Sequence, residues 1–186
     1  MTLNKLRFDV IGQLAALRRY ARSLTRNDAD AEDLVQDALV RAYEKRASFQ
    51  SGRNLRVWLL SILHNAFVDG VRARTAERTR IADAHVFGDE TTAPSQEHHV
   101  RLAQIRRTFL TLPEEQRAAL HLVALEGLSY GEAAAALNIP VGTLMSRLAR
   151  GRAALRALED GDDAADDARA RPSHLKIVGG SDEPPR

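Results

Sequence analysis

Two arginines and two hydroxyl side chains recur at helical spacing near residue 145. They are Thr143, Ser146, Arg147 and Arg150. Residues three or four positions apart share one side of a helix, so these four are expected to line a single face. Arginine forks bind guanine edges or phosphates, and short hydroxyls permit close approach, which is what a helix in the major groove of DNA needs. The alternative is a helical hairpin whose arginines are only solvated.

The surrounding sequence predicts the two helices and the tight turn that would position this face. Ser129 and Glu132 have the spacing of a capping box at the start of the first helix. Asn138 tolerates the left-handed conformation that ends a helix, and Pro140 suits the start of the next. The apolar stripes expected to face the core are Tyr130, Ala133, Ala134 and Leu137, then Val141, Leu144, Leu148, Leu155 and Leu158.

Three amphipathic helices are predicted in the first 75 residues. The first spans the apolar repeat from Leu3 to Leu24, the second runs over 31–45, and Asn54 caps the third. The second helix carries an outer stripe of acceptors, Asp33, Gln36 and Asp37. Such a stripe is either a solvated face or a dock for a basic partner, and the periodicity alone favours the solvated face. The outer side of the third helix carries Asn65, Asp69 and Arg72, while Trp58 falls on its apolar side and is interpreted as core.

Composition excludes several classes of site. The 186 residues are 44% hydrophobic, enough for a packed core, and include no cysteine, so disulfides, thiolate metal sites and cysteine nucleophiles are excluded. The net charge of +2 decides nothing. His98 and His99 are adjacent and would diverge on a helix, so no metal site is predicted, and no cofactor is implied. No stretch resembles a signal peptide or a membrane span, and we expect a cytoplasmic protein without membrane insertion.

The fold class predicted from these patterns is all-α. A three-helix front bundle over 1–75 and a four-helix rear domain over 100–159 would be joined by a flexible linker at 76–99, where apolar periodicity disappears. From Asp160 to the end, an acidic, Ala-rich and then Pro/Gly-rich tail is expected to be disordered.

In this order and spacing, the segments resemble the small, two-domain extracytoplasmic-function (ECF) group of bacterial RNA polymerase sigma factors. The resemblance covers roughly residues 5–158. The residues that carry it are Asp30–Leu39, Trp58–Asn65 with Asp69 and Arg72, Leu112–Arg117, Gly127–Tyr130 and Pro140–Leu148. Ser23–Thr25 and Ser48–Gln50 resemble the general-stress branch of the alphaproteobacteria.

The resemblance implies a role for each surface. Residues 1–75 would be a region 2-like domain in which Asp33, Gln36 and Asp37 bind core RNA polymerase. The minus-ten element would be held, with one base flipped out, by Ser48, Arg53, Asn65, Asp69 and Arg72. Residues 100–159 would be a region 4-like domain that reads the minus-thirty-five element through Thr143, Ser146, Arg147 and Arg150. Such proteins perform no chemistry themselves, and an anti-sigma factor commonly restrains them.

Two other interpretations compete with a sigma factor. A stand-alone helix-turn-helix regulator would bind a symmetric operator as a dimer without polymerase. An enzyme is disfavoured because the sequence offers no cysteine and no histidine–carboxylate motif such as H-E-x-x-H.

Overall fold

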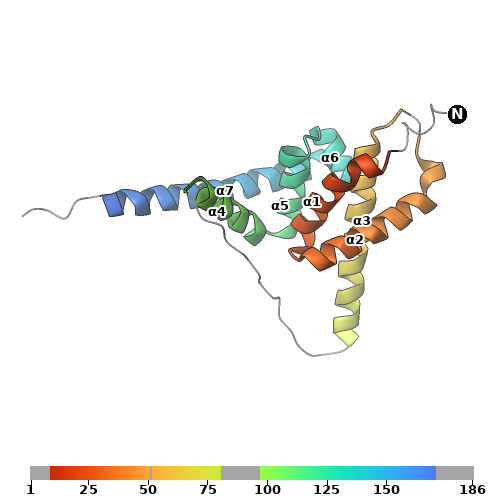
Figure 1. Cartoon of the computed structure of the whole chain (residues 1–186), viewed down its shortest axis with the longest axis horizontal. Helices are drawn as coiled ribbons and strands as arrows, with labels where there is room; N and C mark the ends of the chain where they lie inside the picture. Colours follow the sequence, from red (N-terminus) through yellow and green to blue (C-terminus); the bar gives the residue numbers. More distant parts are fainter. Residues whose placement is uncertain (1–8, 51, 81–96, 171–186) are drawn as a thin grey trace, which may run out of the picture.

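The computed structural model describes residues 9–50, 52–80 and 97–170, without the side chains of 77–80, 97–101 and 158–170, and all its regular elements are helical (Figure 1). The front half comprises η1 (Ile11–Gln13), α1 (Leu14–Thr25), α2 (Asp28–Glu44), η2 (Arg46–Ser48) and α3 (Leu55–Arg80). The rear half comprises α4 (Glu97–Thr111), α5 (Glu114–Leu120), the π-helical turn η3 (His121–Leu125), α6 (Tyr130–Ala136) and α7 (Val141–Ala170). The all-α class and the two groups of helices are as predicted.

Short polar signals set the helix boundaries in the front half. Arg26 adopts the left-handed conformation, with φ of 61°, and ends α1. The side chain of Asn27 then accepts hydrogen bonds from the backbone N–H groups of Ala29 at 2.8 Å and Asp30 at 3.1 Å, which caps α2. Asn54 caps α3 in the same way, as the sequence predicts, through a 3.1 Å bond from the backbone N–H of Arg56.

The predicted helix-turn-helix is present as α6, a turn and α7. Ser129 and Glu132 form the capping box, each side chain accepting from the other residue's backbone N–H at 3.3 and 3.0 Å. At the other end of α6, Asn138 has φ of 52°, and the N–H groups of Asn138 and Ile139 bond back to the last turn. This is the Schellman arrangement, and α7 starts directly after Pro140.

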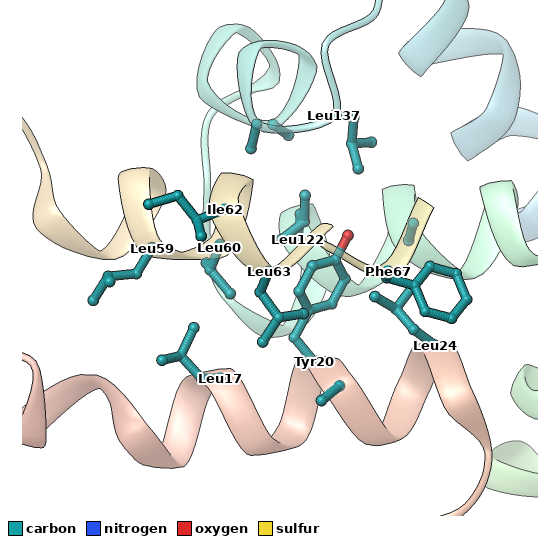
Figure 2. Close-up of a cluster of buried hydrophobic side chains, with 14 of the residues drawn as sticks. Leu17, Tyr20, Leu24, Leu59, Leu60, Ile62, Leu63, Phe67, Leu122 and Leu137 are labelled. Atoms are coloured by element: carbon teal, nitrogen blue, oxygen red, sulfur yellow. The ribbon is translucent and has the colours of Figure 1, made fainter. Parts of the chain in front are cut away.

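One hydrophobic core runs through both halves. In Figure 2, side chains from α1, α3, η3 and the end of α6 meet in a single cluster around the ring of Tyr20. Leu63 and Leu122 are fully buried in it although they come from opposite halves of the chain. Trp58 packs against this cluster and its ring lies 5.2 Å from that of Phe49, consistent with the prediction that it belongs to the core. The two halves therefore pack against each other, which we call the closed arrangement.

Several expectations differ from the structure at helix ends. Helix α3 continues to Arg80 and α4 starts at Glu97, so both extend into the range assigned to the linker, and α7 extends ten residues beyond Asp160. Ala and Arg, which are good helix formers, recur in the extensions of α3 and α7. Tyr130 and Val141 were expected in the buried stripes but are 40% and 44% exposed, because each is the first residue of its helix and lies beyond the packed turns. The side chain of Leu158 lies outside the described residues.

Candidate functional site

The acceptor stripe of α2 is solvent-exposed along its whole length. Asp33, Gln36 and Asp37 all point away from the core, on the opposite side from the buried Leu34 and Ala38. None of the three is engaged in a salt bridge among the described residues. The stripe is therefore free to meet a partner.

Sequence reasoning missed two apolar residues that extend this stripe. Val40 and Tyr43 are 59% and 65% exposed and follow Gln36 at the i+4 and i+7 positions of the same helix. The guanidinium of Arg46 lies 4.1 Å from the centre of the Tyr43 ring, a cation–π contact that holds the ring on the surface. The helical spacing from Gln36 was the signal that could have revealed them. Helix α2 thus presents an acidic and apolar surface, and we call it the α2 surface.

The residues predicted for the minus-ten element lie in a loop and along one helix. Ser48 ends η2 and Arg53 lies in the loop before α3, where Gly52 has a positive φ of 102° that makes the turn; both side chains are exposed. Asn65, Asp69 and Arg72 are exposed on one side of α3, spaced at i, i+4 and i+7. At 1.5 Å per residue, this stripe begins about 15 Å along the axis of α3 from the loop.

A second arginine joins the α3 stripe in the structure. Arg41 of α2 donates to the carboxylate of Asp69 at 2.7 Å, which fixes Asp69 and adds a positive charge beside it. The pair crosses from α2 to α3, so no local spacing pattern could indicate it. A negatively charged strand lying on Asn65 and Arg72 would therefore meet a partly neutralised Asp69.

The four residues predicted to read duplex DNA differ in their surroundings. Thr143, Ser146 and Arg150 are exposed on α7, and the Ser146 hydroxyl donates to the Gly142 carbonyl at 3.0 Å. The side chain of Arg147 is only 20% exposed and pairs with Glu115 of α5 at 3.0 Å. Three of the four are thus available to a ligand, while Arg147 is already bound within the rear half.

Buried polar groups between the halves were not predicted as a site. The Glu126 carboxylate has a fully buried side chain and accepts hydrogen bonds from Arg19 and Arg56 of the front half. In the opposite direction, the guanidinium of Arg117 donates to the carbonyls of Ser23 at 2.8 Å and Leu24 at 3.2 Å. Burial lowers the pKa of Arg117 to about 10, which leaves it charged at neutral pH. These partners lie 70 to 107 residues apart, beyond any local pattern.

Neither a metal site nor a membrane span is found in the part of the chain that the structure describes. Its histidine and carboxylate side chains nowhere gather in a group of three that would hold a metal ion. Likewise, none of its helices combines the length and the apolar character needed to cross a bilayer. The side chains of His98 and His99, for which the sequence predicts no metal site, lie outside the described residues.

Two family models match the chain, one for each half. The Sigma-70 region 2 model matches residues 13–77, and the Sigma-70 region 4 model matches residues 102–155. The first match spans α1 to α3, with the α2 surface and the α3 stripe. The second spans the helix-turn-helix.

Similar proteins match over most of their own length. The chain is 40% identical over 163 residues to "ECF RNA polymerase sigma factor EcfG" of Rhodopseudomonas palustris, covering 88% of this chain and 90% of that protein. It is 33% identical over 143 residues to "ECF RNA polymerase sigma factor SigM" of Bacillus subtilis, covering 75% and 86%.

Solved structures show a similar fold. The sigma factor RpoE of Bartonella quintana, in complex with the anti-sigma factor NepR, has a TM-score of 0.73 and 34% identity, covering 85% of this chain and 98% of that one. CnrH, in complex with the cytosolic domain of CnrY, has a TM-score of 0.58 and 32% identity, covering 82% and 86%.

Proposed function

Because this chain belongs to the ECF group of RNA polymerase sigma factors, we propose that its exposed surfaces divide the work of promoter recognition between the two halves. As an alternative sigma factor it binds core RNA polymerase and directs transcription initiation, and the polymerase forms the bonds. The observation that supports the division most strongly is that each half matches its own family model and carries its own exposed polar face.

The front half would bind both polymerase and single-stranded DNA. On the α2 surface, Asp33, Gln36 and Asp37 would meet a basic face of the polymerase, and Val40 and Tyr43 would add apolar area. The loop with Ser48 and Arg53 and the stripe of α3 would hold the displaced strand of the minus-ten element. Holding an unstacked base offsets the cost of opening the duplex, which is a few kcal/mol.

The rear half would read the minus-thirty-five element as duplex. Thr143, Ser146 and Arg150 are exposed on α7, at the end of the helix that enters the major groove in helix-turn-helix proteins. For Arg147 to reach DNA, it would have to leave Glu115, so its contribution would be smaller than that of Arg150.

An anti-sigma factor is the proposed restraint. The similarity to RpoE covers 85% of this chain and so includes both halves. The closed arrangement of this chain thus resembles that of a sigma factor described in complex with its anti-sigma factor. The likeness to RpoE and to EcfG also supports the general-stress branch as the place of this protein within the group.

Run-off transcription tests the function as a whole. Purified core polymerase and this chain are incubated with a pool of genomic fragments, and the transcripts are sequenced. We expect transcripts from a small set of fragments that share two upstream elements, and none from core alone. A chain that forms a stable dimer on a palindrome, and leaves core polymerase inactive, would be the stand-alone regulator instead.

A further inference from the structure

The closed arrangement is too compact to span a promoter. The minus-ten and minus-thirty-five elements are about 25 base pairs apart, or about 85 Å of duplex at 3.4 Å per base pair. In the structure, however, α3, which begins just after Arg53 and Asn54, packs directly against α6, the first helix of the helix-turn-helix. A chain with this contact cannot engage both elements, so the two halves must separate before the protein acts as proposed.

One buried carboxylate joins the halves in addition to the hydrophobic core that they share. The side chain of Glu126, at the end of η3, is 0% exposed. Arg19 of α1 donates to its Oε1 through Nε at 3.2 Å and Nη2 at 3.0 Å, and Arg56 of α3 donates to its Oε2. The third partner, Nε2 of His121 at 3.3 Å, belongs to the rear half. Both charges that balance Glu126 therefore come from the opposite half of the chain.

Arg117 makes a reciprocal contact from the rear half. Its Nε and Nη2 donate to the carbonyls of Ser23 and Leu24 in the last turn of α1, where a helix leaves its carbonyls without partners of its own. The same guanidinium also donates to the carbonyls of Leu110 and Leu112 in the rear half. Part of its bonding therefore survives separation of the halves, whereas Glu126 loses both arginines at once.

From these contacts we infer that Glu126 is a latch that keeps the free chain closed and autoinhibited. The inference rests on the proposed function, because only a promoter-binding protein needs to open. Removing one partner of such a buried pair leaves the other charge without its counter-charge, which destabilises the arrangement that buries it.

The absence of cysteine permits a direct measurement of opening. Since the 186 residues include none, Ala15→Cys on α1 and Ala153→Cys on α7 provide two unique labelling sites, both exposed. Energy transfer between dyes at these positions reports the separation of the halves in the free full-length chain. We expect high transfer in the unaltered chain and a clear loss of transfer with Glu126→Gln and with Arg19→Ala.

Arg18→Ala is the matched control. Arg18 is the neighbour of Arg19 and donates to Glu32 at 3.0 Å, but this pair is exposed and lies within the front half. Its loss should leave the energy transfer unchanged.

A double variant tests whether the two residues act through one contact. Adding Arg19→Ala to Glu126→Gln should cause no further opening, because the partner of Arg19 is already removed. Circular dichroism of Arg19→Ala, whose side chain is 51% exposed, checks that the helices remain folded.

The two arms of the test separate the latch from the function. If the energy transfer in Glu126→Gln and Arg19→Ala equals that in Arg18→Ala, Glu126 does not keep the halves closed, whatever transcription shows. If the latch variants open, the concentration of chain that half-saturates core polymerase in run-off transcription should fall, by roughly threefold or more, because less of the chain is held in an incompetent state. If the variants open but half-saturate core polymerase at the same concentration as the unaltered chain, the closed arrangement does not inhibit binding to the polymerase. No transcript from any variant would instead contradict the proposed function.

Discussion

At the scale of single residues, Arg150 and Arg147 differ although helical spacing places them together. Arg150 is exposed, so its guanidinium is free to contact a base edge. Arg150→Ala should weaken binding to the preferred minus-thirty-five element by about 1–3 kcal/mol, with little effect on unrelated duplexes. Arg152→Ala, an exposed arginine on another side of α7, is the control and should change both affinities equally. Titrations of holoenzyme on matched and mutated elements measure this, and an equal loss on all DNA with Arg150→Ala would indicate a phosphate contact.

The buried His64 should make the stability of the fold depend on pH. It is buried, with Nδ1 3.1 Å from the Tyr20 hydroxyl, and burial followed by the charge of Arg147 lowers its pKa to about 4. An unfolded histidine titrates near 6.5, so below that pH the unfolded chain binds a proton that the folded chain does not. Stability should therefore fall as the pH drops from about 6.5 towards 4, by on the order of 2 kcal/mol at pH 4.5 for this group.

Urea denaturation at pH 7 and pH 4.5 checks this prediction. In His64→Gln the group that titrates is gone, so the loss of stability between the two pH values should be smaller than in the unaltered chain. Some loss should remain, because burial, Arg19 and Arg56 also lower the pKa of His121, to about 3. Equal losses in the two proteins would mean that the fold does not lower the pKa of His64.

At the scale of helices, Gly151 lies where α7 passes close to Leu120 of α5. A Cβ built there would lie 2.7 Å from Cδ1 of Leu120, which is itself buried. Gly151→Val should push the helices apart and cost about 1–3 kcal/mol of stability, as overpacking does. The control is Gly70→Ala in α3, where a Cβ meets nothing within 4 Å and the gain should be about 0.5–1 kcal/mol. Thermal unfolding measures both, and a Gly151→Val protein as stable as the parent would contradict this packing.

The charge of the α2 surface should decide how tightly the chain binds core polymerase. Asp33→Arg with Asp37→Arg reverses the α2 surface without touching the core, so affinity for core polymerase should fall at least tenfold, or about 1.4 kcal/mol. Asp28→Arg, at the start of the same helix and on another side, is the control and should bind nearly as well. A pull-down with titrated core polymerase measures the change. Unchanged affinity in the double variant would show that polymerase binds elsewhere.

At the scale of the whole molecule, local chemistry was predictable and long-range pairing was not. The capping box of Ser129 and the left-handed Asn138 follow from residue types a few positions apart. The Glu126 pairs do not, because Arg19 lies 107 residues away and many other arginines were possible partners. For the same reason, periodicity placed Arg147 on the correct face but gave no sign that Glu115 would hold it.

The closed arrangement is also a property of the whole chain. Each half has an amphipathic pattern that predicts its own bundle, yet the buried Leu63 and Leu122 share one core. Sequence patterns assign residues to a buried face without saying whether that face meets its own half or the other. The interface between the halves therefore had to come from the structure.

Permanganate probing of a promoter complex tests the division of labour between the halves most directly. Permanganate reacts with unpaired thymines, and a footprint on the same fragment reports protected duplex. With core polymerase and this chain together, we predict reactive thymines in the minus-ten element and protected duplex about 25 base pairs upstream, with neither signal from core alone. Protection of a palindrome by the chain alone, without any reactive thymines when core is added, would contradict the account.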